Sequence, residues 1–317
     1  MSVAQFLASK HDTAFSFEVL PPVRGKSIES VYRTIERLLP FNPSYINITT
    51  HRTETVYHEL GNGTYERLSV VSRPGTVAIA AALRGRYNLP TVPHVICSGF
   101  TKTENENELF DLSFLGITDL LVLRGDRALD EKRFTPTPGG HAHAIDLCRQ
   151  VNDFNEGVLI DGLRQQSPAI PFSYGVAGYP EKHEEAMNLD TDIAHVAEKV
   201  NAGAQYVVTQ MFFDNKKYFA FVKALRDAGV TVPVIPGLKP LTVLGHRTMI
   251  PKTFHIDFPA ELAQELSRCQ TNEDVKAVGV EWGIQQAREL KEAHVPSIHF
   301  YSMNASASVE KIAQAIF

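Results

Sequence analysis

Short apolar runs alternate along the chain with longer segments of helical periodicity. The runs are rich in β-branched and aromatic residues, and they predict strands over residues 15–20, 45–49, 91–97, 119–124, 172–177, 206–212, 232–237 and 297–301. Several runs are almost free of polar residues, as in YVVTQMFF from Tyr206. Strands of this kind are buried on both faces, which is typical of a parallel sheet.

The segments between the predicted strands have helical character. Examples are residues 27–39, 143–151, 192–202, 216–228 and 274–292. Gly203 and Gly229 follow two of these segments, where glycine commonly ends a helix in the left-handed conformation. Strand and helix repeat about eight times, which predicts a single α/β domain over residues 1–317, a (β/α)₈ TIM-type barrel.

An open doubly wound sheet is the alternative architecture. It would usually carry a glycine-rich phosphate turn after its first strand. Here Pro21 and Pro22 follow the first predicted strand, and no GxGxxG motif occurs in the chain, so the barrel is preferred. Two connections, 127–140 and 152–167, are long and polar. The first follows a strand exit and is interpreted as a lid or cofactor-edge loop, the second as a surface excursion.

Composition excludes several classes of protein. The 317 residues carry a net charge of −5, so no basic field favours nucleic acid or an anionic membrane as partner. No stretch of about 18 apolar residues predicts a membrane span, and the N-terminus lacks the apolar core of a secretory signal. Three cysteines, Cys97, Cys148 and Cys269, form no CxxC pair. We expect reduced thiols and a cytoplasmic protein.

Polar residues stand where the predicted strands end, and barrels place their chemistry there. They are Glu18, Thr49, His94, Arg124, Asp126, Tyr179, His183, Gln210, Lys239 and Asn304. Glu18 lies inside an apolar run, where loss of hydration raises the pKa of a carboxyl toward neutrality and suits it to donate a proton. The alternative is a carboxylate that pairs with a buried Arg or Lys and only closes the barrel.

Two other strand exits carry groups that suit a polar ligand. In Arg124-Gly125-Asp126, the glycine lets backbone approach a ligand and the charges can meet a phosphate or a polar ring edge. The alternative is a turn closed by its own Arg–Asp ion pair. Gln210 offers an amide that can bind an amide-like ring edge, or it is a core amide bonded to a neighbouring strand. His183, in a polar loop, is either a ligand contact or a solvated side chain.

Metal and hydrolase chemistry are not indicated. His141 and His143 form an HxH pair, but at a predicted helix start rather than on a strand, and no HExxH spacing occurs. We therefore expect no catalytic metal. No GxSxG motif indicates a serine hydrolase. The aromatic residues are not interleaved with basic ones, so no surface for stacking nucleic acid bases is predicted.

Six motifs occur in order, nearly all at strand ends. They are FSFEVLPP from Phe15, LRGD from Leu123, GYPEKH from Gly178, AGAQYVVTQMFFD from Ala202, IPG from Ile235 and HFY from His299. Together, over nearly the whole chain, they resemble the methylenetetrahydrofolate reductase family. The resemblance implies flavin-dependent reduction of 5,10-methylenetetrahydrofolate to 5-methyltetrahydrofolate. It implies noncovalent FAD, NADH or NADPH as hydride donor, ping-pong kinetics and a homo-oligomer.

The resemblance also implies roles for particular residues. Glu18 matches the general acid, Asp126 an aspartate that tunes the flavin and binds the folate ring, and Gln210 a glutamine that binds the pterin and the nicotinamide. Further FAD-contacting positions are Thr49, His94, Arg124, Gly125, Asp126, His143, Ala144, Tyr179, His183, Asp192 and Lys199. His143 and His195 stand where relatives have tyrosine or asparagine.

Two departures from the family pattern concern the C-terminal part. After HFY the family often has an Asn-Arg pair, whereas this chain has Asn304 and Ala305. Because an arginine fork suits a carboxylate, the glutamate tail of the folate must be held by another group, or the preferred folate differs. The chain ends with its eighth barrel helix, so no C-terminal regulatory domain is expected.

Alternatives to the reductase are another FAD-dependent barrel oxidoreductase, such as a proline dehydrogenase-like enzyme, and a barrel that only binds a partner.

Overall fold

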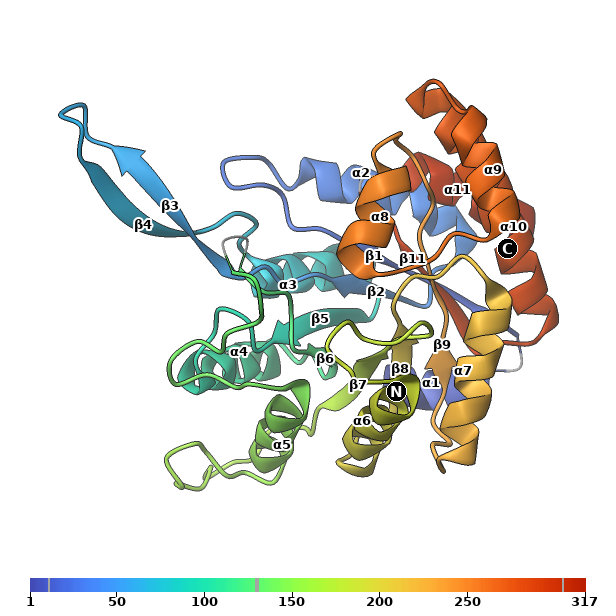
Figure 1. Cartoon of the computed structure of the whole chain (residues 1–317). Helices are drawn as coiled ribbons and strands as arrows, with labels where there is room; N and C mark the ends of the chain where they lie inside the picture. Colours follow the sequence, from blue (N-terminus) through green and yellow to red (C-terminus); the bar gives the residue numbers. More distant parts are fainter. Residues whose placement is uncertain (11, 129–130, 304) are drawn as a thin grey trace. The chain divides into compact units, whose positions relative to one another are not determined.

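The computed structural model describes residues 1–10, 12–128, 131–303 and 305–317 (Figure 1). The strands of its parallel sheet are β1 Ala14–Val19, β2 Tyr45–Ile48, β5 Thr91–Ile96, β6 Asp119–Leu123, β7 Ser173–Gly178, β8 Tyr206–Thr209, β9 Val234–Ile235, β10 Gly237–Leu238 and β11 Ser297–Tyr301. The helices are α1 Val3–Ser9, α2 Glu29–Leu38, α3 Thr76–Tyr87, α4 Lys102–Phe114, α5 Ala144–Asn155, α6 Leu189–Asn201, α7 Asn215–Asp227, α8 His246–Phe254, α9 Ala260–Arg268, α10 Asn272–Glu292 and α11 Ser306–Ile316, with a short 3₁₀ helix, Leu39–Phe41.

The order of the strands confirms the predicted barrel. It runs β10-β11-β1-β2-β5-β6-β7-β8-β9, and β9 and β10 are consecutive halves of one extended segment separated by Pro236. Because β9 pairs with β8 while β10 pairs with β11, this segment borders both ends of the order. The fold is therefore that of a (β/α)₈ barrel. The predicted strand 232–237 is split because proline has no N–H to donate, although the Pro236 carbonyl accepts from His299 N at 3.0 Å.

Most predicted strands agree with the structure within two residues, and 297–301 matches β11. The predicted strand 206–212 is too long, since β8 ends at Thr209. The apolar run continues because Met211, Phe212 and Phe213 are buried in the packed connection that follows. Gly203 and Gly229 have φ values of 119° and 83°, which confirms the two predicted helix ends.

Contacts divide the described chain into two compact units. The first contains Met1–Val19, Tyr32–Asn47 and Ser173–Phe317, and the second contains Leu20–Val31 and Ile48–Phe172. The single domain predicted over 1–317 stays a prediction.

In the first unit, β1 and β11 form the centre of the core. They pair in parallel with Phe17 opposite Phe300 and Glu18 opposite Tyr301. All six residues of β1 are buried, as its apolar sequence predicts. Phe15 packs against Phe300 with ring centroids 5.7 Å apart, whereas the alternate positions of the two strands are mostly polar, so one face of this sheet has a polar layer.

The second unit is built around β5 and β6, which pair with His94 opposite Leu121. Helix α4 packs beside them, and the buried Asn105 donates to Ile96 O at 3.0 Å. The connection 152–167, interpreted as a surface excursion, is mostly exposed after α5 and contains one antiparallel bridge, Val158 to Arg164.

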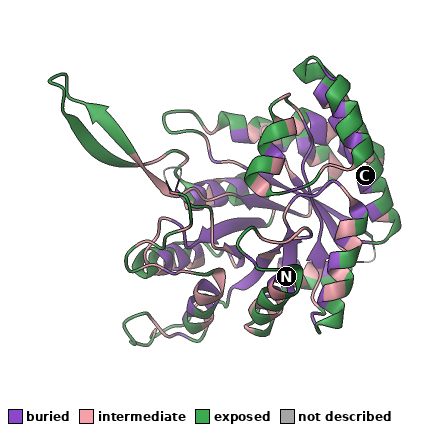
Figure 2. Cartoon of the chain, in the orientation of Figure 1, coloured by how far each residue is buried: buried purple, intermediate pink, exposed green. Residues whose placement is uncertain are grey.

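An antiparallel hairpin also belongs to the second unit and was not predicted. Its strands are β3 Thr53–Glu59 and β4 Tyr65–Val71, and the hairpin projects from the rest of the unit (Figure 1). Figure 2 shows that it is mostly exposed. Because neither face is buried, its sequence lacks the alternation of apolar and polar residues by which half-buried strands are recognised.

Two expectations from composition concern the whole described chain. The three cysteines are buried, and none of them forms a disulfide within the described residues. Among the described residues, no helix combines the length and apolar character needed to cross a membrane.

Candidate active site

The polar layer of the first unit begins at the base of β1 and β11. Ser16 Oγ lies 3.0 Å from His299 Nδ1, and the Tyr45 hydroxyl donates to Ser297 Oγ at 3.4 Å. Since Ser16 and Glu18 lie on the same face of β1, and His299 and Tyr301 on the same face of β11, the layer continues toward the strand exits.

Tyr301 crosses from β11 to β8 over a glycine. Its hydroxyl donates to Thr209 O at 2.5 Å, and Gly237 N donates to Thr209 Oγ1 at 3.0 Å. A Cβ on Gly237 would stand 2.5 Å from the Tyr301 ring and 2.4 Å from Thr209 O. Only glycine leaves room for the phenol to reach Thr209.

Glu18 occupies this layer opposite Tyr301. It is only 4% exposed, and burial raises the pKa of its carboxyl to about 7, with Lys239 acting in the opposite direction. The described residues provide no hydrogen bond or close ion pair to this carboxyl, while the Glu18 backbone carbonyl accepts from Ser302 Oγ at 2.5 Å. The predicted burial and raised pKa are confirmed; the alternative of a tight pair with Arg or Lys is not observed.

Lys239 follows β10 and is buried. Its Nζ donates to Met303 Sδ at 3.2 Å. Burial lowers the pKa of this ammonium, and Glu18 raises it. The nearby His246 has a pKa lowered to about 4 by burial and by Lys239, so its imidazole is neutral near pH 7. Sequence reasoning placed Lys239 at a strand exit but assigned it no role.

Gln210 directly follows β8. Its backbone N–H donates to Gly178 O at 2.8 Å, and its side-chain oxygen accepts from Met211 N at 2.9 Å. These contacts fix the amide at the exits of β7 and β8. Among the contacts of the described residues, none involves its side-chain nitrogen, so this donor is available to a ligand.

Four predicted cofactor positions gather around the exit of β7. Tyr179 and His183 meet edge to face with ring centroids 4.7 Å apart. The buried Asp192 accepts from His183 N at 2.9 Å, and Lys199 Nζ donates to Ala177 O at 2.9 Å. Asp192 and Lys199 therefore hold the β7 exit loop against α6, whereas His195 on the same helix is exposed.

In the second unit, the exits of β2 and β5 bring histidines together. Thr49 Oγ1 lies 3.2 Å from His51 Nε2, and Thr50 donates to the carbonyl of His94. His94 is buried, and burial together with His51 lowers its pKa to about 3. Its imidazole is therefore neutral at physiological pH.

The Arg124-Gly125-Asp126 turn leaves β6 in a left-handed bend. Gly125 has φ of 80°, and a Cβ there would lie 2.9 Å from Ser98 Cβ. The Arg124 guanidinium lies 4.5 Å from the Phe134 ring centroid. The exposed Asp126 carboxylate forms no ion pair with any described residue of its unit, so the predicted alternative of a self-contained Arg–Asp pair is not observed.

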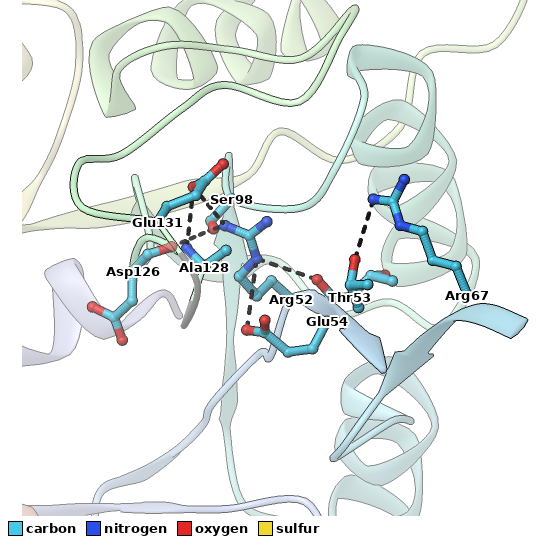
Figure 3. Close-up of polar contacts among 9 residues, drawn as sticks. Arg52, Thr53, Glu54, Arg67, Ser98, Asp126, Ala128 and Glu131 are labelled. Carbon is cyan, nitrogen blue, oxygen red and sulfur yellow. Dashed lines mark hydrogen bonds and ion pairs between the residues drawn. The ribbon is translucent and has the colours of Figure 1, made fainter. Parts of the chain in front are cut away.

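Arg52 connects three strand-exit loops of this unit (Figure 3). Its Nη1 donates to Ser98 Oγ at 3.1 Å and lies 4.0 Å from Glu131 Oε2, and Ser98 in turn donates to the carbonyl of Asp126. The Asp126 carboxylate points away from Arg52 (Figure 3). Loop 127–140, interpreted as a lid or cofactor-edge loop, is thus anchored by Glu131, within its described residues.

The predicted positions His143 and Ala144 lie at the start of α5. The His143 carbonyl accepts from Cys97 Sγ at 3.5 Å, which ties the helix start to the end of β5. The buried His141 is not a metal ligand here, because its Nε2 lies 2.5 Å from Gln150 Oε1. No group of three or more His, Cys, Asp or Glu residues in the described ranges is arranged to hold a metal ion.

Sequence reasoning missed the residues that support these turns, namely His51, Arg52, Ser98, Thr209 and Tyr301. Tyr301 lies within the HFY motif. The polar residues that follow β2 and β5 could have indicated His51, Arg52 and Ser98. Their partners come from other strands, which no local pattern identifies.

Comparison with known proteins decides the family. The family model described as methylenetetrahydrofolate reductase matches residues 3–316. The chain belongs to the methylenetetrahydrofolate reductase family.

Reductases of this family from a plant and a bacterium are similar to it at modest identity. Methylenetetrahydrofolate reductase (NADH) 1 of Arabidopsis thaliana is 26% identical over 306 residues, covering 93% of this chain and 47% of that protein. The 5,10-methylenetetrahydrofolate reductase of Escherichia coli K12 is 26% identical over 291 residues, covering 91% of this chain and 86% of that protein. The chain thus spans about half the length of the plant reductase.

A solved structure supports the fold. An uncharacterized protein from Clostridium thermocellum that binds two copies of 5-methyl-5,6,7,8-tetrahydrofolic acid aligns with a TM-score of 0.58 and 15% identity, covering 98% of this chain and 96% of that one. At this identity the likeness concerns the barrel alone. In the segment where this chain departs from the family pattern, Ala305 is buried, and Asn304 lies outside the described residues.

Proposed function

We propose that this chain catalyses the flavin-dependent reduction of 5,10-methylenetetrahydrofolate to 5-methyltetrahydrofolate, with NADH or NADPH as the source of hydride. One observation carries the proposal: within a chain of this family, the β1 strand presents a buried carboxyl, Glu18, whose pKa is raised to about 7. Such a group holds a proton on about half of the molecules at pH 7 and can give it to a substrate nitrogen.

Glu18 would act on the five-membered ring of the substrate. Its proton passes to N10, the bond from N10 to the bridging methylene breaks with its electrons going to N10, and an iminium forms at N5. The low polarity around Glu18 favours the neutral acid before this step. The open iminium can then accept hydride at the methylene carbon, which becomes the methyl group.

The residues at the strand exits fit noncovalent FAD. In the second unit, Gly125 permits the tight left-handed turn that precedes Asp126, since a Cβ there would lie 2.9 Å from Ser98 Cβ. Arg124 and the N-terminal end of α5 suit a phosphate. Tyr179 and His183 offer ring surfaces in the first unit. We propose that these positions, with Thr49, His94, His143, Ala144, Asp192 and Lys199, hold the cofactor. When bound, FAD supplies a carrier that takes hydride from the nicotinamide and passes it to the folate.

Two polar side chains would orient the rings. The Gln210 side-chain nitrogen can donate to a carbonyl of the pterin or the nicotinamide, and its fixed oxygen holds that donor in one direction. The Asp126 carboxylate can accept from pterin N–H groups, since it points away from the Arg52 network (Figure 3). We propose that Asp126 also tunes the flavin through its negative charge.

A single set of measurements tests this function. The purified protein should show a flavin absorption band that NADH or NADPH bleaches without oxygen, and methylenetetrahydrofolate should restore the band and yield the methyl product. Because both substrates would use the same face of the site, double-reciprocal plots should be parallel. Colourless protein would refute the proposal. Flavin that proline reduces and folate does not reoxidise would favour the proline dehydrogenase-like alternative.

A further inference from the structure

Glu18 and Tyr301 lie on the adjacent strands β1 and β11, and Lys239 directly follows β10, the next strand of the first unit. Glu18 lies opposite Tyr301 in the pairing of β1 with β11. Leu238 lies opposite Phe300 in the pairing of β10 with β11, so the next residue, Lys239, continues the register at the level of Tyr301. Lys239 also shares its face with Gly237, over which the Tyr301 ring lies.

The ammonium of Lys239 is buried without a close carboxylate. It is 9% exposed, and its hydrogen bond goes to the sulfur of Met303, a weak acceptor. No ion pair within 4.0 Å involves it in the described residues. A buried cation requires an opposite charge nearby, and the carboxyl that acts on Lys239 is that of Glu18.

Two other titratable groups close to this pair, Tyr301 and His246, are neutral near pH 7. The pKa of Tyr301 on β11 is raised well above its ordinary value by burial and by Glu18, with Tyr179 and Tyr45 contributing. His246 on α8 has a pKa of about 4. Within the described residues of the unit, Lys239 is therefore the cation that acts on Glu18.

We propose that Lys239 is a positioning residue whose ammonium is the counter-ion of the carboxylate that Glu18 becomes when it gives its proton to the substrate. The inference rests on the proposed function for the identity of that substrate. As the proton leaves Glu18 Oε for the folate nitrogen, one negative charge remains on Glu18, and the Lys239 ammonium stabilises it. Lys239 thereby makes Glu18 a stronger acid than burial alone would allow, without touching the substrate.

The direct test is a pH titration of the Glu18 carboxyl by infrared difference spectroscopy on the flavin-loaded protein. The band is assigned by its loss in Glu18→Gln. Lys239→Met removes the charge at similar side-chain length and should raise the titration midpoint by about 1 pH unit or more. Lys239→Arg should keep the midpoint near that of the unchanged protein. As a matched control, Lys216→Met, on the exposed surface of α7, should not move it.

A kinetic readout connects the titration to the reaction. The rate at which methylenetetrahydrofolate reoxidises the reduced protein should fall at high pH, and this fall should move to higher pH in Lys239→Met. Its plateau should be roughly 3- to 10-fold lower, because a weaker acid transfers its proton more slowly. An unmoved infrared midpoint in Lys239→Met, with a normal melting temperature, would overturn the inference. A moved midpoint in a protein that never reduces folate would instead refute the proposed function and leave the charge pairing standing.

Discussion

Replacing Glu18 by glutamine separates the two halves of the proposed reaction. Glutamine keeps the size of the side chain but has no acidic proton. General acid catalysis is typically worth about 10²–10⁴-fold, which corresponds to about 2.7–5.4 kcal/mol of barrier at 1.36 kcal/mol for each factor of ten. We expect that loss in folate reduction, whereas reduction of the flavin by the nicotinamide needs no such proton.

The assay is anaerobic stopped-flow absorbance of the flavin in each half-reaction across pH 6 to about 9. Because the acid form of Glu18 is the active one and its pKa is about 7, the folate half-reaction should slow about tenfold for each pH unit well above 7. Glu18→Gln should lack this limb. If Glu18→Gln reduced folate at the normal rate, or kept the same pH limb, Glu18 would not be the acid.

The same change should affect stability in the opposite direction from activity. The carboxyl has a pKa of 4.5 as its ordinary value and about 7 in the folded protein, so the folded chain binds the proton more tightly. Stability is therefore lost as pH rises from about 4.5 through 7, by up to about 3 kcal/mol at 1.36 kcal/mol for each pH unit. Glu18→Gln removes this loss, although it leaves Lys239 without its counter-charge. Urea unfolding should show a flatter dependence of stability on pH in the variant, and an unchanged dependence would contradict the assignment of this pKa.

Three further predictions follow from packing, from the loop network and from assembly. Gly237→Ala forces a Cβ to within 2.5 Å of the Tyr301 ring and should lower the free energy of unfolding by about 1–3 kcal/mol. Gly245→Ala is the control, because its added Cβ meets open space. Equal losses of stability in the two variants would refute the close approach at Gly237. Arg52→Ala should release the turn that carries the LRGD motif and raise the KM for folate several-fold. Arg67→Ala on the hairpin is the control and should leave this KM unchanged. Equal KM values in the two variants would show that the contacts of Arg52 are not needed for folate binding. Light scattering should find a homo-oligomer, and a monomer at micromolar concentration would contradict that expectation.

The sequence predicted those features that depend on one strand at a time. The apolar neighbours of Glu18 predicted its burial, and burial is the main cause of its raised pKa. The continuous apolar runs predicted parallel strands buried on both faces. Pro236 interrupts one predicted strand, and its missing N–H is a local signal for the split that the structure shows.

Features that depend on several segments could not be predicted in the same way. Ser98 contacts Arg52 across 46 residues of sequence, and Lys239 acts on Glu18 across more than 200 residues. No characteristic sequence spacing identifies either contact, because each contact depends on which strands are neighbours in the sheet. The hairpin was missed for another reason, since strands exposed on both faces have no apolar face to reveal them.

The segment split at Pro236 has a consequence for how this chain tolerates substitutions. β9 and β10 have only two residues each and pair with β8 and β11, respectively. Hydrogen bonds of the Tyr301 hydroxyl and of Thr209 reinforce this junction. Lys239 and Gln210 stand directly beyond these contacts. The contacts that join this segment to β8 and β11 therefore lie next to the residues assigned to the chemistry, so a substitution that weakens these contacts should also alter the site.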